Sequence, residues 1–77
     1  MSAYTNYITS DYQVMLGKPV LKGTRLTVEL LLRKLAQGAT HADILSMYPF
    51  ISQEHIWAVL EYAADVLANE DTTLSAA

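Results

Sequence analysis

The chain has 77 residues and no cysteine, so the sequence predicts one small domain without disulfides or thiolate chemistry. Hydrophobic residues make up 52% of it, although a domain of this size buries only about 60% of its unfolded surface. Either the core is unusually well filled or a second copy covers the excess, and we expect a homodimer or higher homo-oligomer. No apolar run approaches the ~20 residues of a membrane span and no signal peptide is recognisable, so we expect a cytoplasmic protein.

The charges are divided unevenly along the chain. Residues 1–38 hold all five Lys and Arg residues against two acids, a net charge of +3. Residues 39–77 hold six acids and neither Lys nor Arg, a net charge of −6. This division indicates either a bipolar molecule or a polyanion-binding half joined to an acidic half.

Short strands are predicted before residue 27, within residues 7–26. Residues 7–9 favour a strand, and residues 19–21 and 24–26 flank Lys22-Gly23, a typical two-residue hairpin turn in which glycine supplies a positive φ. Because a lone ribbon is only marginally stable, we expect these strands to need a partner, which a second subunit could supply.

A first helix is predicted over residues 28–37. Thr27 is a good N-cap, and Gly38 suits the left-handed residue that ends a helix. Four apolar residues at helical spacing form its buried stripe: Val28, Leu31, Leu32 and Leu35.

Two further helices are predicted, over residues 41–47 and 52–68. Thr40 caps the shorter one, with Asp43 as an imperfect capping-box partner, and Pro49 prevents its continuation. Ser52 caps the longer one, and residues 69–77 are predicted to be a flexible tail. A short helix, a turn and a longer helix after a first helix make the outline of a helix-turn-helix.

The motifs within these elements are distinctive. Gly17-Lys-Pro-Val-Leu-Lys-Gly-Thr-Arg-Leu-Thr-Val28 is followed by Gly38-Ala-Thr, Asp43-Ile44, Tyr48-Pro49, Ile51-Ser52, Ile56 and Leu60-Glu-Tyr-Ala63. Over residues 8–64 the chain therefore resembles the bacterial family called domain of unknown function 433. Three positions depart from the family pattern: Leu16 stands where a second glycine is frequent, Tyr12 where a proline often follows the aspartate, and His55 where an acid is common.

The resemblance implies both a fold and a function. The fold is mainly α, a tri-helical, homeodomain-like helix-turn-helix bundle with short N-terminal strands or a hairpin, in a single domain over residues 1–68. The function is that of an antitoxin-like protein associated with a PIN-like nuclease toxin.

The third predicted helix raises an objection to DNA binding. On a helical wheel, Glu54, Glu61 and Asp65 lie around Ala58 on the face opposite an apolar arc. That arc is centred on Ile56, Leu60, Ala63 and Leu67, and is wide enough for the core and for a second contact. Because Lys and Arg supply most of the affinity for DNA, an acidic stripe is out of place on a recognition helix.

Candidate DNA-binding residues lie at the start of that helix and in the basic half of the chain. They are Gln53 and His55, where base edges are usually read, and the cations Lys18, Lys22, Arg25, Arg33 and Lys34. Each has a structural alternative: Ser52 simply caps while Gln53 is solvated, Arg33 pairs with Glu29, and lysines keep an edge strand soluble.

Two hypotheses follow. The first is a dimeric, antitoxin-like helix-turn-helix protein that binds a PIN-like toxin nuclease and, with it, operator DNA. The second is a dimeric protein-interaction module that does not bind DNA, in which Glu54, Glu61 and Asp65 mask the basic groove of a nuclease. No metal-ligand spacing, catalytic constellation or cofactor motif is present, so we expect no enzyme activity, no metal, no cofactor and no small-molecule substrate.

Overall fold

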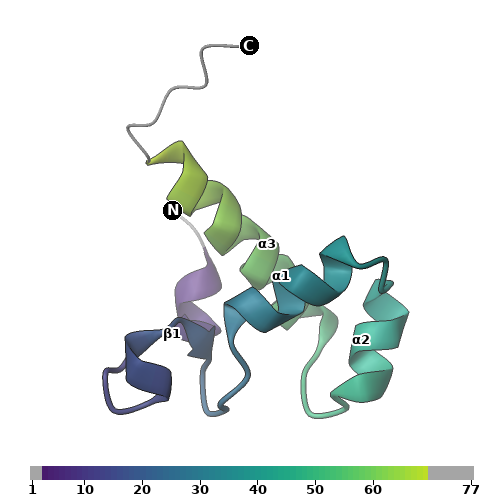
Figure 1. Cartoon of the computed structure of the whole chain (residues 1–77), viewed down its shortest axis with the longest axis horizontal. Coiled ribbons are helices and arrows are strands. Elements are labelled where there is room, and N and C mark those ends of the chain that lie inside the picture. The colour runs from purple at the N-terminus through teal and green to yellow at the C-terminus, as the bar shows by residue number, and fades with distance from the viewer. Residues whose placement is uncertain (1–2, 70–77) are drawn as a thin grey trace.

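A computed structural model describes residues 3–69 of the chain. In chain order, its elements are the 3₁₀ turn η1 (Ala3–Asn6), strand β1 (Ile8–Thr9), turn η2 (Met15–Gly17), strand β2 (Val20–Leu21), and helices α1 (Val28–Ala36), α2 (His41–Met47) and α3 (Gln53–Ala68) (Figure 1). The predicted fold class, mainly α with three helices and a short antiparallel strand pair, is confirmed. The predicted tail lies outside the described residues except for Asn69.

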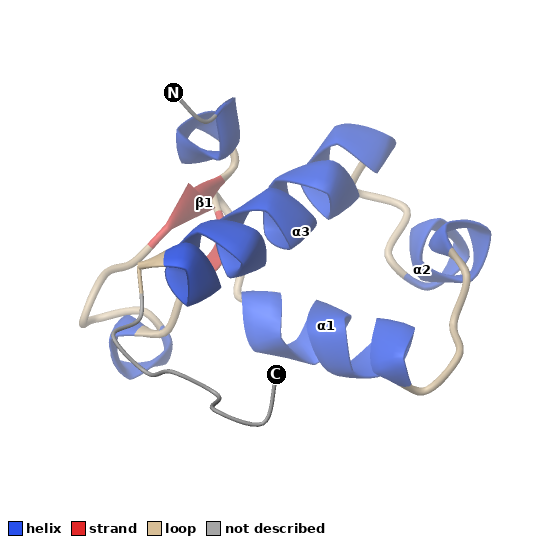
Figure 2. Cartoon of the chain, turned by 90° about the horizontal axis from the view of Figure 1, so that it is seen from above, coloured by secondary structure: helices blue, strands red, loops and turns tan. Residues whose placement is uncertain are grey.

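The long helix α3 organises the molecule. It crosses α1, while the strand pair and η1 lie towards one end of the domain and α2 lies at the other (Figure 2). Helix α3 packs against η1, α1 and α2, so the N-terminal turn and both other helices are all anchored on it. Its last turns extend beyond the rest of the domain (Figure 1).

Helix α1 has the predicted caps at both ends. The backbone N–H of Leu30 donates to Thr27 Oγ1 at 3.1 Å, which satisfies one of the unpaired donors of the first turn. At the other end Gly38 has a φ of 103°, and the N–H of Ala39 donates to the carbonyl of Lys34 at 3.0 Å. This Schellman arrangement needs a left-handed residue, which glycine adopts without strain.

The helix-turn-helix pair is fixed by two N-terminal caps. In α2 the capping box is complete: Asp43 N–H donates to Thr40 Oγ1 at 3.0 Å, and Thr40 N–H donates to Asp43 Oδ2 at 2.9 Å. In α3 the N-cap residue is Ser52, whose N–H donates to His55 Nδ1 at 3.0 Å. An imidazole therefore takes the place that a Glu or Gln has in the usual capping box.

The strand pairing differs from the prediction. Strand β2 pairs with β1, with Ile8 opposite Leu21 and Thr9 opposite Val20, and residues 24–26 form no strand. The predicted turn is present, because Thr24 N–H donates to the carbonyl of Leu21 at 2.9 Å, but beyond it the chain makes only an isolated bridge to Val20 before α1 begins. Strand β1 of the same chain thus supplies a partner for β2.

The core joins the strand pair to all three helices. Its largest fully buried side chains come from β2, α1, α2 and α3, and they are Val20, Leu21, Leu31, Ile44, Ile56 and Val59. Among residues 3–69 no buried polar side-chain atom lacks a hydrogen-bond partner. The core is therefore held by apolar contact, and it fixes the orientation in which α3 presents its outer side.

The turn η2 is strained. Met15, Leu16 and Gly17 have φ values of 51°, 56° and 84°, and a left-handed conformation costs a non-glycine residue about 1–2 kcal/mol. Glycine would carry no such cost at residue 16.

We expect Leu16→Gly to raise the free energy of unfolding by about 0.5–1 kcal/mol, because the released strain exceeds the entropy that glycine adds to the unfolded chain. Urea denaturation followed by circular dichroism measures this. Leu16→Ala is the matched control, since it removes the same exposed side chain but keeps the strain. Equal gains in the two variants would show that removing the side chain, and not relieving the backbone, is responsible.

Candidate interaction surface on the third helix

Helix α3 has a buried side that is broader than the wheel predicted. Ile56 and Val59 are buried as expected, but Ala58, which the wheel placed outward among the acids, is buried as well. The reason is η1, which packs on this side of α3 and brings Tyr4 against Tyr62 in an edge-to-face contact at 5.2 Å. No pattern in the sequence assigns residues 3–6 to α3, apart from the two tyrosines Tyr4 and Tyr7, which are three residues apart.

The predicted acidic residues of α3 remain accessible beside η1. Glu54 and Glu61 are exposed, Asp65 is half-buried, and α3 has no Lys or Arg. Within residues 3–69 the ion pairs are Lys18–Glu29 and Arg33–Glu29, so none neutralises these three carboxylates. One side of the helix therefore presents uncompensated negative charge.

Two hollows flank α3 on different sides. The first, about 180 Å³ in volume, lies between η1 and α3 and is lined by Tyr4, Tyr7, Glu54, Trp57, Ala58 and Glu61. The second, about 270 Å³, lies between α1 and the last turns of α3 and has an entirely apolar lining of Val28, Leu32, Tyr62, Ala63, Val66 and Leu67. We call them the aromatic–acidic hollow and the apolar groove.

The apolar arc that the wheel assigned to one face of α3 is in fact divided between core and surface. Ile56 is buried, whereas Leu60 is 40% exposed and Leu67 is 66% exposed. Trp57, on the edge of the same arc, is 57% exposed. Exposed apolar side chains of this size on one helix make this surface a candidate for contact with another protein.

The candidate DNA-reading residues at the start of α3 are held by bonds within the chain. The amide nitrogen of Gln53 lies 2.7 Å from Nδ1 of His41, which ties α3 to the first turn of α2. His55 accepts the N–H of Ser52, and its ring packs edge-on against Tyr7 at 5.0 Å. In this arrangement both side chains brace the helix-turn-helix, and each would have to leave its partner to meet a base edge.

Three of the five candidate cations also have partners. Glu29 Oε2 accepts from Arg33 Nε at 3.0 Å, and Glu29 Oε1 lies 3.6 Å from Lys18 Nζ. The hydrogen bond from Arg33, reinforced by the charges of Lys18 and Arg33, lowers the pKa of Glu29 below its ordinary value, so this carboxylate stays ionised and holds both cations. Lys22 Nζ donates to the carbonyl of Thr5 at 3.2 Å.

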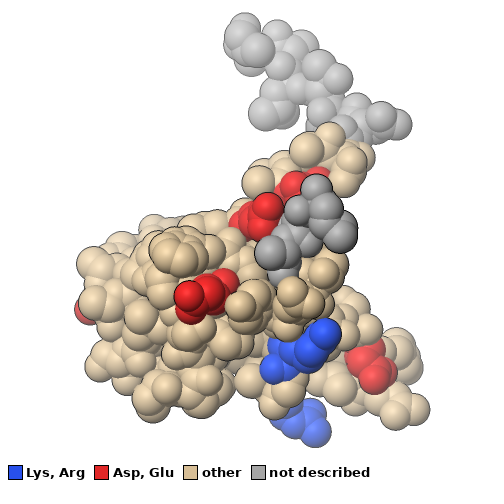
Figure 3. All heavy atoms as spheres, turned by 180° about the vertical axis from the view of Figure 1, so that it is seen from behind, with Lys and Arg blue, Asp and Glu red and all other residues tan. Residues whose placement is uncertain are grey.

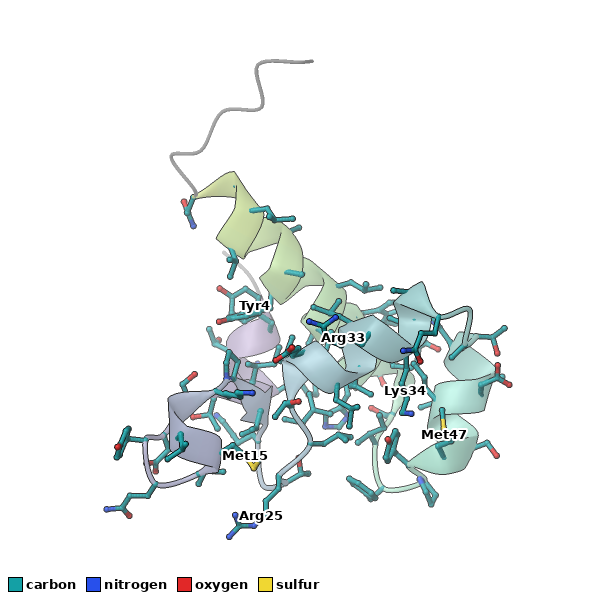
Figure 4. The ribbon with its side chains drawn as sticks, viewed as in Figure 1. Tyr4, Met15, Arg25, Arg33, Lys34 and Met47 are labelled. Carbon is teal, nitrogen blue, oxygen red and sulfur yellow. The ribbon has the colours of Figure 1, made fainter. Side chains whose placement is uncertain are left out.

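Arg25 and Lys34 have no hydrogen bond or ion pair from their side chains within residues 3–69. Figure 4 shows Arg25 extending from the edge of the molecule near Met15, well away from Lys34 on α1. On the face shown in Figure 3 basic side chains lie together at the lower part, whereas acidic side chains are spread more widely and follow α3. The two unpaired cations, Arg25 and Lys34, thus lie on different parts of the molecule.

A third hollow, next to the turn that follows β2, does not mark a charged site. It measures about 570 Å³ and is lined by Thr9, Asp11, Val14, Val20, Gly23, Thr24 and Arg25. It is open to solvent, and Asp11 and Arg25 offset each other within it, so it has no net charge that would select an ion.

Within residues 3–69 no group of three or more His, Cys, Asp and Glu residues is placed to hold a metal ion. None of the helices there has both the length and the apolar character needed to cross a membrane.

Comparison with known proteins places the chain in a family. Neither a curated protein nor a solved structure matches the chain. A family model does match it, over residues 8–63, which is more than half of the chain and runs from β1 through most of α3. The chain belongs to the family described as "Protein of unknown function (DUF433)".

Proposed function

We propose that this chain is an antitoxin-like protein of the cytoplasm, without catalytic activity of its own, that binds a PIN-like nuclease toxin through the outer side of α3. One observation carries the proposal. The exposed side of α3, the second helix of the helix-turn-helix, carries acidic and aromatic side chains and no Lys or Arg. A nuclease must contact phosphates with Lys and Arg, so an acidic surface is complementary to its substrate groove.

The test is inhibition of RNA cleavage by a PIN-like nuclease from the same genome. We expect the purified chain to abolish cleavage at an equimolar ratio and to form a complex stable in gel filtration. Bovine serum albumin, also acidic, is the control for nonspecific masking. Cleavage that continues at a large excess of the chain, with no complex, would contradict the proposal.

A second candidate function is operator binding, which the helix-turn-helix geometry favours. Here Arg25 and Lys34, the two cations without partners, would contact phosphates, and Gln53 would exchange His41 for a base edge. Each phosphate contact adds about one unit to the slope of log affinity against log salt. Operator binding requires Gln53 to leave His41, whereas binding a protein through α3 requires no such rearrangement. Operator binding is therefore the second candidate.

We also propose that the functional unit is a homodimer formed at the apolar groove. The exposed lining of the groove is apolar, and Leu67, which lines it near the end of α3, is itself largely exposed. In a twofold arrangement Leu67 of each copy can enter the groove of the other, which leaves the acidic side of each α3 free for the nuclease.

Leu67→Glu is expected to convert the dimer into a monomer, because it places a carboxylate in a groove whose exposed lining is apolar. Light scattering coupled to gel filtration, over a range of concentrations, measures the mass. Leu16→Glu is the matched control, since Leu16 is 77% exposed and does not line the groove. A wild-type chain that is monomeric at high concentration, or a Leu67→Glu variant that stays dimeric, would refute this assembly.

A further inference from the structure

We infer that the aromatic–acidic hollow between η1 and α3 is the receptor for an arginine side chain of a basic protein partner. The inference deepens the proposed function, on which the identity of the partner rests, by naming the chemical group that anchors it. The hollow measures about 180 Å³. That is smaller than the roughly 300–1,000 Å³ of small-molecule sites and suits one long side chain.

Aromatic rings supply the first half of the recognition. Tyr4, Tyr7 and Trp57 all line the hollow. Tyr4 is braced edge-on by Tyr62 at 5.2 Å, and Tyr7 by His55 at 5.0 Å, so two of the three rings are held in place before a ligand arrives. Aromatic faces attract cations, and tryptophan does so most strongly.

Two carboxylates supply the second half. Glu54 and Glu61 line the same hollow from positions two helical turns apart, and neither is in an ion pair within residues 3–69. A cation between them would lie against rings on one side and acceptors on the other. An anion would be repelled, and a purely apolar group could lie on the rings but would gain nothing from the two exposed carboxylates at the rim.

The geometry favours arginine over lysine. A guanidinium is planar, so it can stack on an aromatic ring while its edge donates two parallel hydrogen bonds to a carboxylate. An ammonium group is a strongly hydrated point charge that can do only one of these at a time. The hollow combines stacking surfaces with carboxylates, which is the combination that a guanidinium uses fully.

The chain contains its own reporter for this site. Trp57 is the only tryptophan among the 77 residues, and it lines the hollow. Its fluorescence can be titrated with the peptide acetyl-Gly-Gly-Arg-Gly-Gly-amide at physiological salt, where the Debye length of ~8 Å suppresses long-range attraction. The matched peptides replace arginine by citrulline, which has the same shape without the charge, or by lysine.

We expect a saturable change with the arginine peptide, a weaker affinity with lysine and the weakest with citrulline. Glu54→Gln with Glu61→Gln should lower the arginine-peptide affinity about tenfold, since charge-assisted bonds are roughly twice as strong as neutral ones. Asp65→Asn is the matched control: it removes a carboxylate from the same helix outside the hollow, and should change the affinity by less than about twofold. Equal binding of arginine and citrulline, or equal losses in the control and the double variant, would overturn the inference.

Nuclease inhibition, measured in parallel, separates this inference from the proposed function. If the peptide binds as expected but the nuclease is not inhibited, the hollow takes arginine and the proposed function fails. If the nuclease is inhibited equally by the wild type and by the Glu54→Gln, Glu61→Gln variant, while the peptide does not bind, the proposed function stands and the inference fails.

Discussion

Replacing Ile44 with alanine is expected to lower the free energy of unfolding by about 3 kcal/mol, within the range measured for large-to-small changes in cores. Ile44 is the only buried residue of α2, with none of its surface exposed. The remaining contacts of this two-turn helix are peripheral, so the cavity left by the change cannot be refilled from α2 itself. In a domain this small, the loss is a large fraction of the total stability.

Urea denaturation followed by circular dichroism measures the effect of Ile44→Ala. Met47→Ala is the matched control, because Met47 is on the same helix and 45% exposed, and it should cost less than about 1 kcal/mol. Similar costs for the two variants would mean that α2 is not attached to the core through Ile44.

Reversing the charges of Glu54, Glu61 and Asp65 to lysine is expected to abolish inhibition of the nuclease. The change turns a complementary surface into one that repels a basic groove, and like charges brought together at an interface cost several kcal/mol. The three side chains are exposed or half-buried and have no ion pair to lose within residues 3–69, so the fold should survive. Inhibition of RNA cleavage is the readout, with the thermal unfolding curve as the check on folding.

The neutral triple variant, with Gln, Gln and Asn at these positions, should give partial inhibition. The control for charge reversal elsewhere is Arg25→Glu with Lys34→Glu, which alters the two unpaired cations and should leave inhibition intact. Full inhibition by the lysine variant would show that the toxin is bound by another part of the chain.

Helix positions could be predicted from the sequence because their signals are local. Thr27 and Gly38 bound α1, and Thr40 with Asp43 begins α2, since each acts on a backbone group within four residues of itself. The observed ends of the helices lie within one residue of those predicted.

Strand pairing and the covering of α3 could not be predicted in the same way. The segments on either side of Lys22-Gly23 fit the local rule for a hairpin. Strand β2 nevertheless pairs with Ile8 and Thr9, about twelve residues earlier in the chain. The burial of Ala58 likewise depends on η1, which no periodicity links to α3. Contacts between segments distant in sequence leave no local pattern.

The types of residue at the candidate site could be predicted from the sequence, but their arrangement in space could not. A wheel identifies Glu54 and Glu61 as neighbours on α3, but Tyr4 and Tyr7 join them only through the packing of η1. The pairing of Gln53 with His41 and of Lys18 with Glu29 was equally hidden, because each joins two different elements. These contacts reduce the side chains available to DNA.

The measurement that bears most directly on the outer side of α3 is fluorescence anisotropy with the DNA upstream of the chain's own gene. Binding of the chain alone to this DNA is compared with its binding to a random duplex, at low and at physiological salt. If α3 is a protein-binding surface, the two duplexes bind equally weakly, and binding disappears at physiological salt. Preference for the upstream DNA that persists at physiological salt and is lost in Gln53→Ala would show instead that α3 reads bases.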